Sequence, residues 1–464
     1  MHIKQLALSI GAILGSLALP GCNLDIPDLN NPGLEQLQNN PTAASINTAA
    51  TGLLVGNRGG KAAVVGYVNL MGILGRESYD FDSADTRFVS EMIQGNLSKS
   101  SPYGGALWAG AYANIRLGNI ILHGVDKVAE FSDADRKGIR GFTHTINALD
   151  LFTVIITRDE IGAVIDTDHP LGEPLGGFVG KDAVYKEINR LLDLAATELA
   201  GAGTAFTFLT SPGFKGFDTP ATFLKFNRAR RARMAVYTTD YATALTALAG
   251  SFISDTGTPD FKAGVNYVYS LTSGDATNGL INPAIYAHPS LLTDVQMNGT
   301  TADLRYSSKV GPAKMDGSTV TAGSDPSLRT TIKFKIYTNV APIAVIRNEE
   351  LILLKAEALY YTGDKPGALA ELNIVRTKSG GLLPLPPETI VDDATFLKAL
   401  LYERRYSLMF EGGYRWIDLR RFNILLPLDS PAHIRNLRFP IPQAECDARP
   451  TEKACTYNSS DPIH

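Results

Sequence analysis

Apolar side chains recur at helical spacing over much of this chain. In residues 184–199 they return every three or four positions, which places them on one face of a helix. The segments 109–125 and 221–237 show the same period, as does the stretch from Tyr241 to Ala249. Residues 137–157 begin in this way but end in a β-branched run, so the pattern leaves the end of that helix open. The sequence therefore predicts a mostly α-helical protein.

A pair of helices is predicted over residues 347–378. Leu351, Leu354 and Ala358 share one face of the first helix, and Pro366 suits the start of the second after a short break. This layout resembles a tetratricopeptide hairpin. Because a single hairpin cannot bury its own apolar face, several hairpins are expected to stack. The predicted fold is mostly α, with tetratricopeptide-like helical hairpins stacked as a short solenoid.

Residues 251–335 interrupt the helical pattern. They are rich in Gly, Ser, Thr, Asp and Asn, and we expect loops and short strands there. Long loop-rich inserts in compact proteins often carry function. The expected division is an N-terminal helical part at 45–250, the loop-rich insert at 251–335, and a C-terminal part at 336–464 that holds the hairpin and a charged segment.

The first residues are typical of a secretory signal. Lys4 precedes an apolar run from Leu6 to Leu19, which is shorter than the about 20 residues that a membrane-spanning helix needs. Cys22 then follows a small residue, an arrangement that resembles a bacterial lipobox. We expect a signal peptide at 1–21, lipid attachment at Cys22 and a lipid-proximal tether at 22–44. The alternative is a secreted protein whose cysteine is coincidental.

Charge and cysteine content narrow the classes of function. The formal net charge is -4, and this mild acidity argues against nucleic acid, whose binding needs a basic face. Two further cysteines, Cys446 and Cys455, lie close together near the C-terminus. In an exported protein such a pair favours a structural disulfide over two free thiols.

Residues 403–421 alternate acids and arginines with large apolar residues. The pattern predicts a helix, a break at Gly412 and Gly413, and a second helix. Arginine–carboxylate pairs would tie the two together, because their planar two-point geometry suits such a brace. We therefore expect a structural role, and not ligand binding, for Glu403, Arg404, Glu411, Arg415, Trp416, Asp418 and Arg420.

Several segments resemble those of one known family and occur in the same order. They are the helix at Tyr112–Asn119, the helix at Val184–Leu199, the hairpin from Arg347 to Arg376, the segment from Glu403 to Arg421, and the closing Phe439–Gln443. With the lipobox they cover most of the chain. The sequence is thus similar to the SusD/RagB-like nutrient-binding outer membrane lipoproteins, which implies a SusD-like fold with a loop-rich insert.

The resemblance also implies a function. A protein of this kind would be lipid-anchored in the outer membrane, face the cell surface, and bind oligosaccharides or similar small nutrients. It would deliver them to a SusC-like TonB-dependent transporter and would not be an enzyme. Its partners would be that transporter, the nutrient and, through the lipid, the membrane. Two alternatives remain open: a surface glycoside hydrolase, and a tetratricopeptide-type scaffold for protein interactions.

Catalytic and metal-binding motifs are missing from the sequence. It has no Gly-x-Ser-x-Gly elbow, no Gly-x4-Gly-Lys-Ser/Thr loop and no His-Glu-x-x-His. Asp80, Asp82 and Asp85 form the densest acid cluster, but Ala84 stands where a calcium loop would need a ligand. We expect neither a cofactor nor a metal.

Binding by stacking requires aromatic side chains in loops. The sequence has two tryptophans, Trp108 and Trp416, and both are expected in the core. This scarcity weakens the case for carbohydrate and leaves peptides open as ligands. No residue can be matched to the family's ligand residues by motif. The tentative ligand-binding residues are therefore loop aromatics, namely Tyr79, Phe81, Phe88, Tyr103, Tyr267, Tyr269 and Tyr286.

Overall fold

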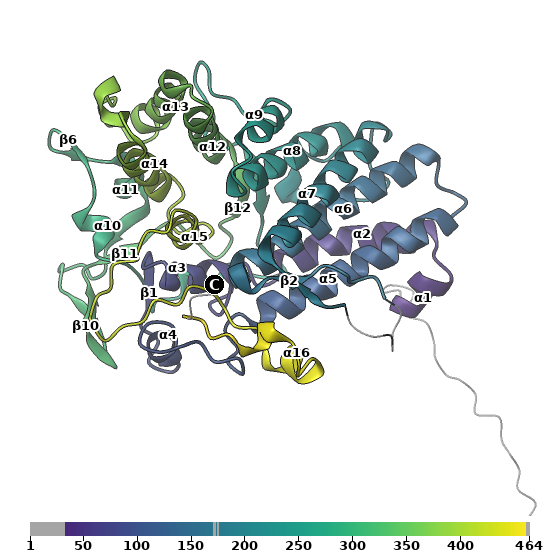
Figure 1. Ribbon diagram of the computed structural model, residues 1–464, viewed down its shortest axis with the longest axis horizontal. Coiled ribbons are helices and arrows are strands. Elements are labelled where there is room, and N and C mark those ends of the chain that lie inside the picture. The colour runs from purple at the N-terminus through teal and green to yellow at the C-terminus, as the bar shows by residue number, and fades with distance from the viewer. Residues whose placement is uncertain (1–32, 170–172, 174–175, 461–464) are drawn as a thin grey trace, which may run out of the picture.

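The computed structural model describes residues 33–169, 173 and 176–460. Packed helices make up most of this part of the chain, and the short strands and loops of the middle segment gather at one side of them (Figure 1). The signal peptide expected at 1–21 and the lipid site expected at Cys22 lie outside the described residues.

The N-terminal half consists mainly of helices. They are α1 (Leu34–Asn39), α2 (Ala43–Arg58), α3 (Tyr67–Leu74), α4 (Arg87–Ser90), α5 (Gly105–Gly124), α6 (Asp133–Arg158), α7 (Lys181–Ala200), α8 (Pro220–Tyr237) and α9 (Tyr241–Ala249). Helices α5 to α9 pack against one another in sequence order, α1 and α2 pack on α5, and the short α3 and α4 lie against the strand β1 (Ser78–Asp80). Local chemistry fixes where several of them start. Thr42, Ser132 and Thr219 each accept a hydrogen bond from the backbone three residues ahead, which satisfies an N–H that the helix leaves free.

Helix α6 runs to Arg158, through the β-branched run that left its end open in the sequence. Val154, Ile155 and Thr157 are all buried there. The helix lies between α5 and α7 and packs against both. Burial on several sides outweighs the small helix-propensity cost of β-branched residues, so the helix continues.

The C-terminal half begins with the predicted hairpin. Its helices are α12 (Asn348–Tyr361), α13 (Lys365–Lys378), α14 (Asp393–Ser407), α15 (Tyr414–Arg421) and α16 (Gln443–Ala448), after the short α10 (Ser290–Thr293) and α11 (Leu304–Lys309). Ala356 and Ala358 are fully buried. Tyr360 of α12 stacks on Phe396 of α14, with 3.7 Å between ring centroids. The hairpin is thus packed into the helical row.

Strands occur as two-stranded antiparallel pairs among the described residues. The pairs β1–β5 and β4–β12 attach the loop-rich insert, residues 251–335, to the helical body. The strands are β1 (Ser78–Asp80), β2 (Ala163–Val164), β3 (Phe178–Val179), β4 (Gly264–Tyr267), β5 (Ile285–Ala287), β6 (Met297–Asn298), β7 (Thr301–Ala302), β8 (Val310–Pro312), β9 (Val320–Ala322), β10 (Asp325–Thr330), β11 (Ile332–Phe334) and β12 (Ile343–Arg347).

The predicted fold class is confirmed: the described chain is mostly helical, with stacked hairpins. The tether expected at 22–44 differs in its described part, where residues 34–39 form α1. Leu37 of that helix is buried, and Lys127 donates a hydrogen bond to the carbonyl of Gln38. These contacts dock the segment onto the body, although its sequence shows no clear helical period.

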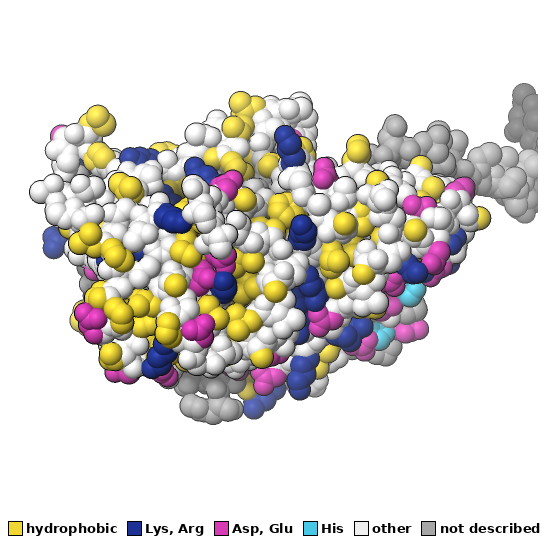
Figure 2. Space-filling model, turned by 90° about the horizontal axis from the view of Figure 1, so that it is seen from above, with side chains coloured by type: hydrophobic (Ala, Val, Ile, Leu, Met, Phe, Trp, Pro, Cys, Tyr) yellow, Lys and Arg dark blue, Asp and Glu magenta, His cyan; other side chains and the backbone are white. Residues whose placement is uncertain are grey.

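The surface seen from above mixes charged and apolar side chains (Figure 2). Lys and Arg side chains lie among Asp and Glu on this face, so one sign of charge does not dominate it. Within the described ranges, every helix is too short or too polar to cross a membrane.

Close packing of α5 against α6 generates a test with a control on the same helix. A Cβ at Gly118 would lie 2.1 Å from Oδ1 of the buried Asn147, whereas a Cβ at Gly110 would meet nothing within 4 Å. We predict that Gly118→Ala lowers the free energy of unfolding by about 1–3 kcal/mol through overpacking. Gly110→Ala should raise it by up to about 1 kcal/mol through helix propensity. Urea unfolding followed by circular dichroism measures both; equal effects would contradict this packing.

Candidate functional site

Strand pairing brings together aromatic residues from two distant segments. In the β1–β5 pair, Tyr79 lies directly opposite Tyr286. The N–H of Phe81 donates to the carbonyl of Ala284 at 2.9 Å, which extends the pairing past the strand end. Because alternate residues of a strand share a face, Phe81 points to the same side as these two tyrosines. Its ring centroid lies 5.1 Å from that of Tyr79 and 5.4 Å from that of Tyr286.

The three rings differ in depth. Tyr79 is 1% exposed, and its hydroxyl donates to Asp429 at 2.8 Å. Phe81 and Tyr286 are half-buried, so their rings reach the surface. We call Phe81 and Tyr286 the aromatic pair. Tyr79 supports it from below.

Polar groups adjoin the aromatic pair. Nζ of Lys333 lies 5.8 Å from the Tyr286 ring centroid and donates to the carbonyl of Pro283 at 3.4 Å. Asp82, next to Phe81, is half-buried and accepts from the backbone N–H of Ala84 at 2.8 Å. Such a surface can stack on a flat apolar face of a ligand while charged groups meet the ligand's polar edge.

The other loop aromatics do not join this surface. Phe88, in α4, and Tyr103 stack on each other with 5.0 Å between their ring centroids. They are 1% and 2% exposed, because both pack into the hydrophobic core. Tyr269 is also buried. Tyr267 is half-buried, and its hydroxyl donates to Asn57 at 2.7 Å. In this structure these four rings pack the interior, and a ligand at the surface would not reach the buried ones.

The carboxylates of the acid cluster, Asp80, Asp82 and Asp85, all form hydrogen bonds or ion pairs with nearby protein groups. Asp80 accepts from Nδ2 of Asn69 at 2.8 Å, and burial raises its pKa to about 6. Asp85 pairs with Arg87 at 2.8 Å, and Asp82 caps the turn at Ala84. Across the described ranges, no group of three His, Cys, Asp or Glu residues is placed to hold a metal ion.

The charged segment folds into buried ion pairs. Arg404 donates to both oxygens of Asp418, at 2.6 and 3.0 Å, and both side chains are almost fully buried. Glu403 pairs with Arg376 at 2.9 Å and with Arg305 at 2.6 Å. These contacts tie α14 to α15, α13 and α11. Glu411 in the intervening turn pairs with Arg347 at 2.8 Å, where β12 meets α12.

The remaining residues of this segment also brace the body. Nε of Arg415 donates to the carbonyl of Gly75 at 3.0 Å. The guanidinium of Arg420 lies 3.7 Å from the ring centroid of Trp416, whose Nε1 donates to the carbonyl of Asn436 at 2.9 Å. Gly413 has φ of 69°, and a Cβ there would lie 2.4 Å from Met71, so the break requires glycine. Both tryptophans of the chain, Trp108 and Trp416, are buried.

One buried carboxyl joins the aromatic site to the charged segment. Glu77, just before β1, is 1% exposed, and its Oε1 accepts from the N–H of Phe410 at 2.9 Å. Its Oε2 has no hydrogen-bond partner among the described residues. Burial raises the pKa of Glu77 to about 7. Phe410 has φ of 55°, which is unusual for a bulky residue, so this hydrogen bond holds a strained turn.

A pocket lies beside α15. It is a pocket of about 290 Å³ whose wall includes Trp416 and Arg420, and Leu425, on its rim, is 74% exposed. Its volume is at the low end for a small-molecule site. At the C-terminus, Cys446 and Cys455 form a disulfide with 5.5 Å between their Cα atoms, which closes the loop that follows α16.

Comparisons with known proteins place this architecture. The model of the SusD family matches residues 295–434. A SusD superfamily protein from Bacteroides vulgatus superposes with a TM-score of 0.66 at 15% identity, over 90% of this chain and 98% of that one. A SusD-like carbohydrate binding protein from Bacteroides fragilis gives 0.63 at 16% identity, over 84% and 87%. A laminarin binding SusD-like protein gives 0.59 at 17%, over 88% and 97%. A search of curated proteins found no match.

The buried pair of Arg404 and Asp418 generates a stability test. Asp418→Ala would leave a buried guanidinium without its carboxylate, so we predict a loss of about 3–5 kcal/mol in the free energy of unfolding. Glu187→Ala removes the partner of the exposed Arg190, 2.7 Å away, and should cost under about 1 kcal/mol. Urea unfolding compares them. A stable Asp418→Ala variant that has lost ligand affinity would instead assign Asp418 to binding.

The raised pKa of Glu77 predicts a pH effect on stability. From pH 4.5 to about pH 7 the folded state keeps the proton and the unfolded state loses it, so stability falls as pH rises. Glu77→Gln keeps an acceptor for Phe410 and carries no charge. It should stabilise the protein by about 2–3 kcal/mol at pH 8 and change little at pH 5. Glu130→Gln, at an exposed position, should act alike at both pH values; equal behaviour of Glu77→Gln would contradict the assignment.

Proposed function

We propose that this chain is a SusD/RagB-like protein that binds a small nutrient, an oligosaccharide or a similar molecule, at the cell surface; the family match over residues 295–434 and the SusD-like fold support this. It would hold the ligand on the aromatic pair and deliver it to a TonB-dependent outer membrane transporter of the SusC kind. In this proposal the chain is a binding protein and not an enzyme. The observation that carries the proposal is the half-buried aromatic pair, formed where the end of β1 meets the insert.

The chemistry of the aromatic pair supports a glycan as ligand. Sugar rings present apolar C–H faces that pack on aromatic rings, while their hydroxyls need charged or amide partners. Phe81 and Tyr286 offer the ring faces, and Lys333 and Asp82 lie beside them. Two SusD-like proteins of similar fold are described as carbohydrate binding and laminarin binding. A peptide with a flat apolar side chain would satisfy the same groups.

The expected anchor completes the proposal. A signal peptide at 1–21 and an acylated Cys22 would tether the body to the outer membrane, facing outward. Several acyl chains give stable attachment, at about 0.8 kcal/mol per buried methylene. We keep the expected helical part at 45–250, the insert at 251–335 and the part at 336–464, and we expect the tether to end before α1, which is docked on the body. In this arrangement the insert and the residues that follow β1 form the binding face.

Two other functions would leave different traces. A glycoside hydrolase needs two carboxylates facing each other across a cleft, and turnover of a glycan panel would reveal it. A tetratricopeptide-type scaffold would bind a protein segment and no small ligand. The aromatic pair favours the nutrient-binding function over both.

Single substitutions in the aromatic pair test the proposed site. We predict that Phe81→Ala and Tyr286→Ala each weaken binding of the glycan or peptide selected on a ligand array at least about tenfold, or 1.4 kcal/mol. The matched control is Tyr241→Ala, because Tyr241 is half-buried and stacks on Tyr361 at 4.9 Å, away from the site. It should bind like the wild type in isothermal titration calorimetry.

Two results would contradict the proposal. Unchanged affinity in both aromatic variants would remove the ligand from this surface. Failure to co-purify a transporter from detergent-solubilised membranes of the native host would count against the delivery role, whatever the ligand.

A further inference from the structure

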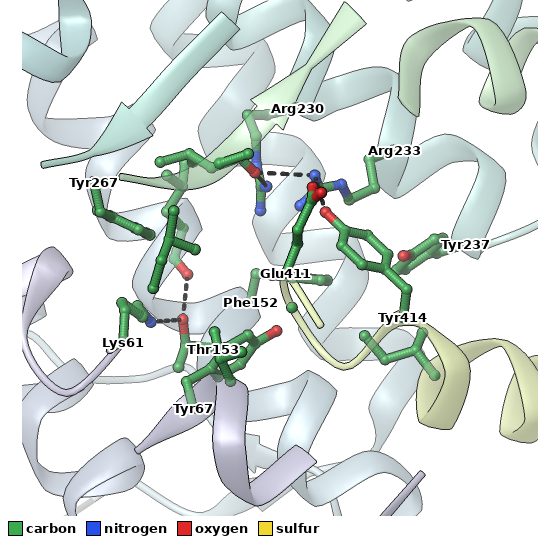
Figure 3. Close-up of a pocket in the computed structure, with 17 residues that line it drawn as sticks. Lys61, Tyr67, Phe152, Thr153, Arg230, Arg233, Tyr237, Tyr267, Glu411 and Tyr414 are labelled. Atoms are coloured by element: carbon green, nitrogen blue, oxygen red, sulfur yellow. Dashed lines mark hydrogen bonds between the residues drawn. The ribbon is translucent and has the colours of Figure 1, made fainter. Parts of the chain in front are cut away.

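A small cavity lies inside the protein, where the N-terminal helices meet the charged segment. Its wall comes from α3, α6 and α8, from β4 and β12, and from the turn at Glu411–Tyr414 (Figure 3). Its volume is about 40 Å³. A single water needs about 10–15 Å³ by this measure, so the cavity can hold a few waters or one small ion but not a sugar ring.

The side chain of Arg230 points into this cavity (Figure 3). Arg230 is 4% exposed, and its Nη1 donates to the carbonyl of Val345 at 3.1 Å. Its guanidinium also lies over the ring of Phe152, 5.1 Å from the centroid. Among the described residues it forms no ion pair with a carboxylate, and its Nε and Nη2 have no acceptor. It is a buried cation with donors to spare.

A second buried cation lines the same cavity. Lys61 is 6% exposed, and its Nζ donates to Oγ1 of Thr153 at 2.9 Å. The negative charge of Asp150 acts on Lys61, but the Asp150 carboxylate accepts hydrogen bonds from Asn57 at 2.7 Å and from Asn114 at 2.6 Å. Burial lowers the pKa of Lys61 to about 8 and that of Arg230 to about 10, so both remain cationic at pH 7.

The anionic groups near the cavity are matched to other cations. Glu350 accepts from Nε and Nη2 of Arg233, and Tyr414 donates to the same carboxylate at 2.9 Å. Glu411 is held by Arg347 at 2.8 Å and by Lys309 at 3.2 Å. The hydroxyl of Tyr237, also on the wall, has no partner among the described residues. The cavity therefore presents donors and positive charge in excess.

We propose that this cavity is a binding site for one small monovalent anion of the size of chloride, held between Arg230 and Lys61. Buried cations are costly unless a counter-charge compensates their lost hydration. An anion here supplies that charge for Arg230, which has no carboxylate partner among the described residues, and adds to the charge that Asp150 provides for Lys61. It also links α6 and α8 to β12 and the turn at 411–414, so it stabilises the junction of the two halves. This role is separate from the proposed nutrient binding at the surface.

Crystals of the protein grown in bromide test the site directly. Bromide replaces chloride and gives an anomalous signal, and we expect a peak in the cavity within hydrogen-bond distance of Arg230. Anomalous peaks at the outer surface alone, or a cavity filled by water, would overturn the proposal. The wild-type protein suffices for this test, so it holds even where a variant fails to fold.

Thermal unfolding gives a second readout. At equal ionic strength, the melting temperature should be higher in sodium chloride than in sodium gluconate, whose anion is too large for the cavity, by about 1–2 °C or more. Arg230→Met should abolish this difference. Arg231→Met is the matched control, because Arg231 is the next residue of α8 and pairs with Asp193 at 3.1 Å instead. The control should keep the chloride effect; equal melting temperatures in both salts for the wild type would overturn the proposal.

Discussion

The arrangement of this protein depends on buried arginine–carboxylate pairs. Arg404 with Asp418 fixes α15 against α14, and Arg233 with Glu350 fixes α8 of the N-terminal half against α12 of the C-terminal half. Separating a buried charge from its partner costs about 3–5 kcal/mol, so alternative packings that separate these pairs are disfavoured. The pairs therefore select one arrangement of two halves that apolar contacts alone would specify less strictly.

The position of the aromatic pair depends on contacts made by the charged segment. Phe410 sits in the turn between α14 and α15, and its N–H is held by Glu77, which directly precedes β1. The strand then pairs with β5, and that pairing sets Phe81 beside Tyr286. A contact deep in the protein is thus connected to the exposed rings through one hydrogen bond and three residues of strand. This connection explains why residues of the charged segment position the site while contributing nothing to its exposed rings.

The helices could be predicted from the sequence, but the contacts between distant segments could not. Tyr241–Ala249 was predicted to the residue, because Asp240 caps its start and Gly250 follows its end. Phe88 and Tyr103 looked like loop aromatics, yet they are buried, since burial depends on what the rest of the chain places over them. The pairing of Tyr79 with Tyr286 could not be predicted, because neither residue's neighbours in the sequence indicate which distant strand it will face. Helix α8 is rich in arginine, and which of its arginines lack a carboxylate partner depends on the distant helices α7 and α12.

The helical body and the insert are under different constraints on their amino-acid sequence. The helical body must satisfy many buried charges at once, so its sequence has little freedom to drift. Buried pairs such as Arg305 with Glu403 hold part of the insert to the body. The insert is also attached through β1–β5 and β4–β12, whose backbone hydrogen bonds tolerate many side chains. Loops between those anchor points can therefore change length and composition during evolution without disturbing the scaffold. With the binding surface proposed above, such a design would let the preferred ligand change while the helical frame stays the same.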